Sequence, residues 1–173
     1  MDHLDSFLQK LEECGAQIEV LTQSHVRVKP TTHLHAPEKL QTAVHPGFPT
    51  DLQAPFAVLL TQCEGETHVH ETLFEGRLNY LHELERMGAR VELLNPHEAI
   101  ITGPTQLKGT FIASYDIRAG AAMLLASLVA EGETRISDIR YIDRGYEMLD
   151  EKLRNLGAKI ERIEDDVKPA QVC

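Results

Sequence analysis

The segment Leu84-Glu85-Arg86-Met87-Gly88-Ala89-Arg90-Val91-Glu92 reads as the end of an amphipathic helix followed by the start of a strand. Nearly the same pattern occurs at residues 11–19 and again at residues 153–161. In each copy a glycine stands where a helix can end in a left-handed C-cap, and the alternating residues after it favour a strand. The chain therefore repeats a unit of about 70 residues, marked by Gly15, Gly88 and Gly157.

A second element recurs with a similar period. Residues 51–54 read Asp-Leu-Gln-Ala and precede an apolar helix, and residues 116–119 read Asp-Ile-Arg-Ala and precede another. Each helix is followed by Glu-Gly-Glu-Thr, at residues 64–67 and 131–134. A helix that is apolar on nearly every face must be buried on every face. We therefore expect an α/β fold in which apolar helices lie inside and sheets lie outside.

The apolar periodicity and the turn residues predict the order of the elements. Helices are expected at residues 4–14, 52–63, 76–87, 117–130 and 145–156. Strands are expected at residues 17–22, 25–29, 67–72, 90–94, 98–102, 108–114, 133–138 and 158–163. A connector at residues 33–44 should be partly extended near residues 40–43. The chain begins part-way through a unit, and about two and a half units are expected. Residues 1–163 should form one partial domain, followed by a frayed tail at residues 164–173.

Composition limits the classes of function. The chain has 173 residues, a hydrophobic fraction of 42% and a formal net charge of −10. An acidic protein is poorly suited to nucleic acid or to an anionic membrane, so neither partner is expected. The longest apolar run, residues 119–130, is shorter than the roughly 20 residues that cross a bilayer. The N-terminus lacks a signal-peptide h-region, and three cysteines without paired spacing indicate reduced thiols in a cytoplasmic protein.

Four ionic residues fall at the expected strand-to-helix junctions: Asp51, Arg77, Arg118 and Arg144. An arginine at a helix N-terminus has the wrong sign for the helix dipole, and such violations of local rules gather where function requires them. The arginine fork, beside the free N–H groups of a helix N-terminus, suits a carboxylate or a phosphate. A second interpretation stays open, in which each arginine forms a structural bridge with its neighbour Glu75, Asp116 or Asp143.

The carboxylate of this set lies in the turn His45-Pro46-Gly47-Phe48-Pro49-Thr50-Asp51-Leu52-Gln53. Its prolines and glycine favour a rigid turn that places Asp51 at the mouth of the next helix. The local sequence favours Thr50 or Asp51 as a simple N-cap. The ionic residues at the other junctions shift the balance towards Asp51 as a functional carboxylate.

Other candidate sites are weaker. The histidines of His33-x-His35 and His68-x-His70 would lie in pairs on strand faces, but no further ligands complete a zinc site, so we expect no metal. The chain shows no Gly-rich phosphate loop and no Ser/His/Asp spacing, and no cofactor is expected. Cys14 and Cys63 are interpreted as packed core residues.

Several segments taken together resemble the UDP-N-acetylglucosamine enolpyruvyl transferase family. They are residues 45–54, 71–77, 116–120, 128–134 and 141–147, in this order. The resemblance extends over nearly the whole chain. The sister family, 5-enolpyruvylshikimate-3-phosphate (EPSP) synthase, shares the fold but not these segments. The resemblance implies an inside-out α/β barrel of βαβαββ units with the helices inside.

The resemblance also implies a reaction. The 3-hydroxyl of UDP-N-acetylglucosamine adds to C2 of phosphoenolpyruvate, C3 is protonated, and phosphate leaves from a tetrahedral intermediate. This is the first committed step of peptidoglycan synthesis. The chemistry needs a base near the hydroxyl, an acid near C3, and cations around the carboxylate and the phosphate.

The roles of individual residues follow from the same resemblance. It implies that Asp51 contacts the sugar 3-hydroxyl and acts as the base. Leu73 would contact the UDP-sugar through its backbone, and Phe74 would line that region. Three arginines would bind the anionic groups of phosphoenolpyruvate and of the intermediate, with Arg144 also in the catalytic set: Arg77, Arg118 and Arg144.

Enzymes of this family contain more repeat units than this chain. The part not represented here holds a Lys-Asn pair, a mobile loop with the acid cysteine, and further uridine-diphosphate contacts. We therefore expect the C-terminal portion of such an enzyme, inactive alone, whose partner is the missing N-terminal half or another copy of itself. The alternative is a non-catalytic UDP-sugar-binding or assembly module derived from the family.

Overall fold

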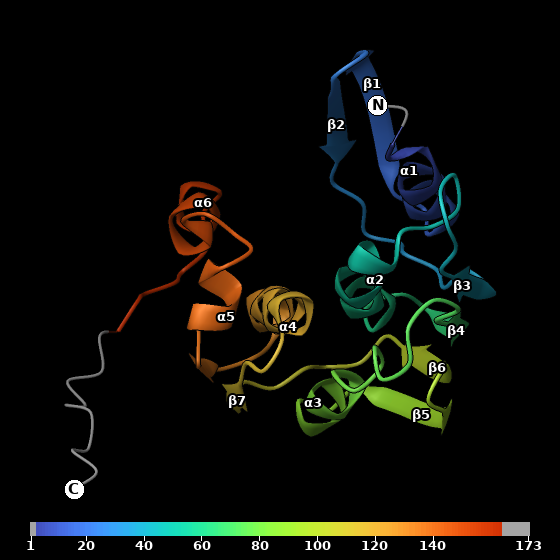
Figure 1. Ribbon diagram of the computed structural model, residues 1–173. Coiled ribbons are helices and arrows are strands. Elements are labelled where there is room, and N and C mark those ends of the chain that lie inside the picture. The colour runs from blue at the N-terminus through green and yellow to red at the C-terminus, as the bar shows by residue number, and fades with distance from the viewer. Residues whose placement is uncertain (1–2, 164–173) are drawn as a thin grey trace, which may run out of the picture.

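The structure is a computed structural model that describes residues 3–163 (Figure 1). The expected frayed tail at residues 164–173 lies outside the described residues. The helices are α1 (Asp5–Glu13), α2 (Gln53–Leu60), α3 (Leu81–Arg86), α4 (Ile117–Val129), α5 (Arg140–Asp143) and α6 (Leu149–Asn155), with a 3-10 turn η1 (Thr50–Leu52) before α2. The strands are β1 (Gln17–Thr22), β2 (His25–Lys29), β3 (Lys39–Gln41), β4 (Gly65–His70), β5 (Arg90–Asn95), β6 (Glu98–Gly103), β7 (Phe111–Ala113) and β8 (Arg135–Ser137).

The described strands form three sheets. The largest has the order β3-β4-β6-β5, in which β3 is parallel to β4 and β6 is antiparallel to both β4 and β5. The strands β1 and β2 form an antiparallel hairpin, and β7 and β8 form a parallel pair. From β3 to β6 the order is strand, helix, strand, helix, strand, strand, which is one complete βαβαββ unit. An αββ portion precedes it and a β-helix-β portion with two further helices follows, so the predicted α/β fold is confirmed.

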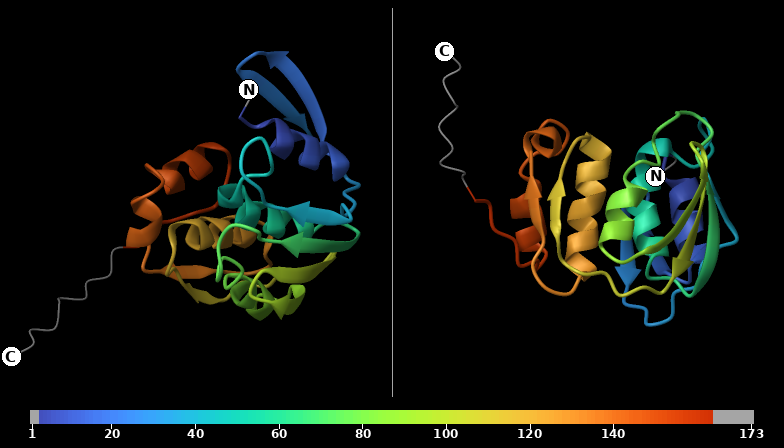
Figure 2. Two further views of the ribbon diagram at one scale, coloured as in Figure 1. Left: turned by 45° about the vertical axis from the view of Figure 1, so that its right-hand side comes forward. Right: turned by 90° about the horizontal axis from the view of Figure 1, so that it is seen from below.

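The apolar helices α2 and α4 lie between the four-stranded sheet and the β7–β8 pair (Figure 2). In α2 six of eight residues are buried, including Phe56 and Leu60, so this helix is inside as predicted. In α4 Ala122 and Ala126 are fully buried, whereas Leu128 and Val129 near its end are exposed. The prediction of burial on every face is therefore wrong for α4. Among residues 3–163, other elements pack against only part of the surface of this helix.

The repeated glycines end α1, α3 and α6 in the same way. Gly15, Gly88 and Gly157 have φ angles of 87°, 100° and 100°. Each glycine N–H donates to the carbonyl three residues earlier, and the next residue's N–H donates to the carbonyl five residues earlier, at 2.8–3.0 Å. This pair of hydrogen bonds is the Schellman motif. The predicted left-handed C-caps are confirmed in all three copies.

The C-terminal part differs most from the prediction. Met148 has a left-handed backbone with φ 48°, so the helix expected from residue 145 begins at residue 149, after the separate short helix α5. Residues 158–163 form no strand, because no described strand pairs with them. Side-chain bonds hold this segment instead, since Arg162 pairs with Asp143 at 2.8 Å and with Asp150 at 3.1 Å.

The glycine cap of α3 gives a stability prediction. A Cβ built on Gly88 would meet Gln106 O at 3.4 Å, which is ordinary contact, so the cost of a side chain is conformational. Gly88→Ala should lower the free energy of unfolding by about 1–2 kcal/mol, because non-glycine residues disfavour the left-handed region. Gly88→Asn should cost less, since Asn tolerates that region. Urea denaturation measures both, and an Ala variant as stable as the unsubstituted chain would contradict the cap.

Candidate active site

The side chain of Asp51 does not cap a helix. Neither η1 nor α2 has a side-chain cap hydrogen bond, so the N-cap interpretation of Thr50 and Asp51 is wrong. The Asp51 carboxylate instead accepts a hydrogen bond from Arg77 Nη1 at 3.3 Å and another from Arg118 Nε. These partners lie 26 and 67 residues away in the sequence. Three of the four predicted ionic residues are therefore brought together by the fold.

Each arginine is held by its own element. Arg118 is the second residue of α4, whose N-cap Asp116 accepts hydrogen bonds from the backbone N–H groups of Arg118 and Ala119, both at 2.9 Å. Arg77 lies in the turns before α3, and its guanidinium carbon is 4.6 Å from the centroid of the Phe74 ring. A cation–π contact of this kind restrains a long side chain. Both guanidinium groups thus reach Asp51 from anchored positions.

The interpretation of each arginine as a bridge to its neighbouring acid does not describe this site. Asp116 caps α4, and Asp143 pairs with Arg162. Within residues 3–163 no ion pair joins Arg77 to Glu75. Arg77 and Arg118 instead converge on Asp51, which lies in the same βαβαββ unit as Arg77 but outside the portion that carries Arg118.

Electrostatics follow from this geometry. The hydrogen bond from Arg118 lowers the pKa of Asp51, with a further decrease from Arg77, and the same Asp51 contact raises the pKa of Arg118. The three side chains are 60%, 23% and 34% exposed for Asp51, Arg77 and Arg118, so solvent screens the pairs and they contribute little to stability. Two cations and one anion leave a net positive, accessible cluster that suits a second anion.

A sequence profile described as EPSP synthase (3-phosphoshikimate 1-carboxyvinyltransferase) matches residues 1–153. The chain belongs to the EPSP synthase family. This member is 44% identical over 163 residues to the UDP-N-acetylglucosamine 1-carboxyvinyltransferase of Methylacidiphilum infernorum, a match that covers 94% of this chain and 38% of that protein. It is 48% identical over 161 residues to the protein of the same name from Koribacter versatilis, covering 93% of this chain and 36% of that one. The predicted relationship to these transferases is confirmed.

Solved structures agree with the sequence comparisons. The enolpyruvyl transferase NikO from Streptomyces tendae superposes with a TM-score of 0.81 at 31% identity, covering 90% of this chain and 35% of NikO. EPSP synthase from Acinetobacter baumannii has a TM-score of 0.55 at 20% identity and covers 76% of this chain and 31% of that one, which shows the shared fold alone. This family member thus spans about two fifths of the length of the carboxyvinyltransferases it matches.

The remaining predicted site residues lie outside the ion-paired cluster. Arg144 is exposed at the C-cap of α5 rather than at a helix N-terminus, and the described residues include no ion-pair partner for it. Leu73 and Phe74 are 38% and 49% exposed, and Phe74 adjoins the cluster through Arg77.

Sequence reasoning missed Tyr146. Its half-buried phenol lies within electrostatic range of Arg118, Asp51 and Asp116, and burial raises its pKa. Its place two residues after Arg144 was the only sequence signal available for it. Sequence reasoning also missed Glu71, a fully buried carboxylate just after β4. A lone glutamate at a strand end gives no local signal of burial.

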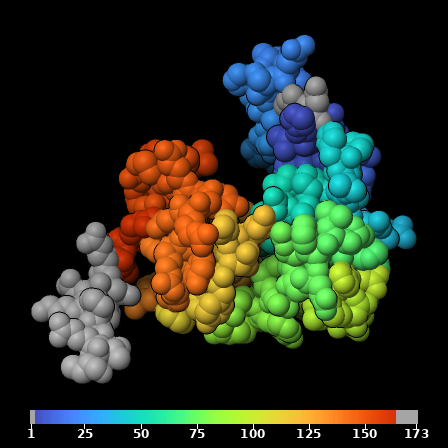
Figure 3. All heavy atoms as spheres, viewed as in Figure 1, coloured from blue at the N-terminus to red at the C-terminus, as the bar shows by residue number. Residues whose placement is uncertain are grey.

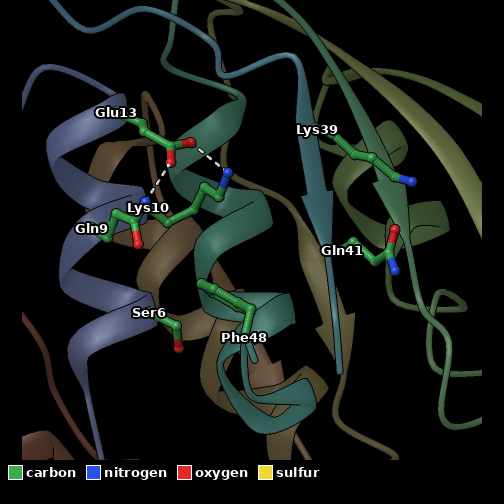
Figure 4. Close-up of a pocket in the computed structure, with 7 residues that line it drawn as sticks. All are labelled: Ser6, Gln9, Lys10, Glu13, Lys39, Gln41 and Phe48. Carbon is green, nitrogen blue, oxygen red and sulfur yellow. Dashed lines mark hydrogen bonds and ion pairs between the residues drawn. The ribbon is translucent and has the colours of Figure 1, made fainter. Parts of the chain in front are cut away.

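The shape of the molecule leaves room beside the site. In Figure 3 a notch open to solvent separates the C-terminal segment of residues 140–155, in orange, from the cyan segment around residues 45–55. A separate open pocket of about 300 Å³ lies between α1 and β3 (Figure 4). Its Glu13 already accepts hydrogen bonds from Gln9 and Lys10, and none of the predicted site residues lines it.

Two structural observations concern metals and membranes. Among residues 3–163 no three His, Cys, Asp or Glu side chains gather as a metal site would need. No helix in the described part of the chain has the length and apolar character to cross a membrane.

The paired Asp51 gives a titration prediction. Because its folded pKa is lower than its unfolded pKa, the pairs stabilise the protein above about pH 3.9, and this stabilisation is lost as the pH falls through the folded pKa. Carboxyl ¹³C NMR should place the Asp51 titration below the ordinary value. Arg118→Gln should raise that pKa more than Arg77→Gln, since the Arg118 bond is the larger cause. Equal titration in all three proteins would contradict the described pairs.

Proposed function

We propose that this chain forms part of an enolpyruvyl transferase that moves the enolpyruvyl group of phosphoenolpyruvate to the 3-hydroxyl of UDP-N-acetylglucosamine. Phosphate is released, and the product enters peptidoglycan synthesis. The observation that supports this most strongly is the convergence of Arg77 and Arg118 on Asp51 in a chain 44% identical to carboxyvinyltransferases. We place the reaction in the cytoplasm, where the buried Cys14 and Cys63 remain thiols.

In this proposal the residues act as an exchangeable set of ion pairs. Phosphoenolpyruvate carries a carboxylate and a phosphate, and both groups compete with Asp51 for the guanidinium groups of Arg77 and Arg118. Binding of the anion weakens the pairs of Asp51 and raises its pKa, which makes its carboxylate a stronger base. Asp51 then accepts the proton of the sugar 3-hydroxyl. The two arginines stabilise the charge that develops on the phosphate.

The other predicted residues complete the proposed site. Arg144 is proposed to bind the anionic groups from the α5 side of the notch and to act in the chemical step. The backbone of Leu73 is proposed to contact the UDP-sugar, with Phe74 lining the same region. No cofactor is needed for this chemistry, because addition of the sugar hydroxyl to C2 and elimination of phosphate from the same carbon require only proton transfers and involve no net oxidation or reduction.

We propose that residues 1–163 are a partial domain that the rest of a longer protein completes as an inside-out barrel. The relatives extend well beyond the matched region, since only 38% of the first relative is covered. The general acid that protonates C3 is proposed to come from that uncovered part. The alternative is a module that binds a UDP-sugar or assists assembly without catalysis, and a complementation experiment separates the two.

The purified chain should release no phosphate from phosphoenolpyruvate and UDP-N-acetylglucosamine on its own. Adding the part of the Koribacter versatilis relative that the chain does not cover should restore phosphate release. Asp51→Asn should then lower turnover at least about 100-fold, because a positioned base contributes at least that much. Glu133→Gln is the matched control, since Glu133 is exposed and pairs with Arg135.

Two other results of this experiment would contradict the proposal. Turnover by the chain alone would show that its site is self-sufficient. Binding of UDP-N-acetylglucosamine without turnover in the mixture would favour the non-catalytic module.

The uncovered apolar residues predict self-association. Phe111 on β7 and Leu128 and Val129 on α4 are 59%, 44% and 49% exposed, and β7 is at the edge of its two-stranded sheet. Exposed apolar faces and open strand edges favour association. Light scattering coupled to gel filtration should give a mass above the 19.4 kDa of one chain. The double variant Leu128→Lys, Val129→Lys should shift the mass towards the monomer, and a monomeric unsubstituted chain would contradict the prediction.

A further inference from the structure

Glu71 is a buried carboxylate at the junction of the segments that form the proposed site. It is 0% exposed and lies directly after β4. Its backbone is fixed to the β5–β6 turn, since its N–H donates to His97 O at 2.8 Å and its carbonyl is 2.8 Å from His97 Nδ1. A buried charge is costly unless donors surround it. The identity of its donors therefore indicates what this carboxylate does.

The two oxygens of Glu71 hold different segments. Oε1 accepts hydrogen bonds from the backbone N–H groups of Leu73 at 2.9 Å and Phe74 at 3.3 Å, and from Thr42 Oγ1 at 2.9 Å. Oε2 accepts a hydrogen bond from Thr50 Oγ1 at 2.8 Å. Thr50 immediately precedes Asp51 in η1. One carboxylate thus touches both the segment proposed to contact the UDP-sugar and the turn that carries the proposed base.

We propose that Glu71 is a positioning residue that couples the two halves of the site, with Oε1 fixing the Leu73–Phe74 backbone and Oε2 fixing the turn of Asp51. The inference rests on the proposed function for the meaning of the two halves. Glu71 itself is fully buried and acts through its neighbours.

The Thr42 hydroxyl strengthens the Oε1 side. It donates to Glu71 and accepts a hydrogen bond from the Thr72 N–H at 2.9 Å, while the Thr72 hydroxyl donates to Thr42 O at 2.6 Å. The end of β3 and residues 71–74 therefore form one hydrogen-bonded unit. In the described chain the only hydrogen bond between Glu71 Oε2 and η1 is that of Thr50. A substitution of Thr50 can therefore break the link to the Asp51 turn and leave the bonds to Oε1 in place.

Substitutions can separate the two oxygens. Thr50→Val removes the Oε2 donor and should raise the pKa of Asp51 towards its ordinary value, because the released turn weakens the bonds from Arg118 and Arg77. It should leave the hydrogen-exchange protection of the Leu73 and Phe74 amides unchanged. Glu71→Met removes every acceptor, so it should raise the Asp51 pKa and also lose that amide protection. Glu71→Gln should retain the protection, because its carbonyl can accept from both amides and its NH₂ can donate to Thr50.

Thr67→Val is the matched control for lost stability. Thr67 is fully buried in β4, and its hydroxyl donates to Pro37 O at 2.7 Å. Among residues 3–163 its side chain forms no hydrogen bond with η1 or with residues 71–74. The substitution should therefore destabilise the chain without changing either the Asp51 titration or the amide protection. Carboxyl ¹³C titration, amide exchange and a titration with UDP-N-acetylglucosamine by NMR measure all four variants.

The binding titration links the coupling to the proposed function. Glu71→Met should weaken UDP-N-acetylglucosamine about tenfold, as expected when an ordered pair of backbone contacts is released, whereas Thr50→Val should change it less than about twofold. If the unsubstituted chain does not bind this ligand, the proposed sugar contact fails, while the titration and the exchange still test the coupling. Unchanged Asp51 titration in Thr50→Val, or unchanged protection of Leu73 and Phe74 in Glu71→Met, would overturn the inference. If Glu71→Met does not fold, Thr42→Val takes its place for the exchange readout. It removes the hydroxyl that bonds to Oε1 and to the Thr72 N–H, so it should lower the protection of the Leu73 and Phe74 amides, and unchanged protection would overturn the inference.

Discussion

The packing of α2 against α4 is the contact on which both the core and the proposed site depend. The two helices are in contact, and both carry small, fully buried side chains: Ala57 in α2, and Ala122 and Ala126 in α4. Small side chains let helices approach closely. Because the turn before α2 and the first turn of α4 lie at the same end of this pair, Asp51 meets Arg118 across 67 residues of sequence. A change in the relative position of these helices would move the carboxylate and the guanidinium together with the core.

The repeat places Asp51 and Asp116 at equivalent positions, yet the two carboxylates bind different partners. Asp116 accepts hydrogen bonds from two backbone N–H groups of its own helix. Asp51 is preceded by a turn with two prolines and enters a 3-10 segment, and its carboxylate faces arginines from two other elements. Asp116 therefore caps a helix, whereas Asp51 is held by two arginines, and in the proposed function a bound anion competes for them.

Buried hydrogen bonds around Glu71 hold the segments that border the exposed, ion-paired cluster. The four donors to Glu71 are two hydroxyls and two backbone amides, so the charge of this carboxylate is compensated by hydrogen bonds rather than by an ion pair. Such bonds are directional and fix the segments that donate them. The segments fixed in this way border the ion-paired cluster, whose own pairs are mostly solvated and contribute little to stability. The buried hydrogen bonds of Glu71 therefore restrain the surface segments more than the exposed ion pairs do.

Local sequence was sufficient to predict the repeat, the α/β class and the C-terminal ends of α1, α3 and α6, because these features depend on nearby residues. A glycine after an amphipathic helix permits a left-handed cap, and all three glycines form one. The hairpin of residues 17–29 was likewise predicted with its observed boundaries. The sequence also indicated that Asp51 and the arginines were unusual, since arginine opposes the helix dipole.

The partners of these side chains depend on the tertiary structure. The choice between a cap and an ion pair for Asp51 was settled by arginines 26 and 67 residues away, which local sequence cannot place. Residues 158–163 alternate like a strand but lack a described neighbour to share hydrogen bonds, so they remain irregular. Glu71 and Tyr146 could be recognised as site residues only from the burial of Glu71 and from the proximity of Tyr146 to Asp51 and Arg118. Local conformation is encoded by nearby residues, whereas the partner of a charge is chosen by how distant elements pack.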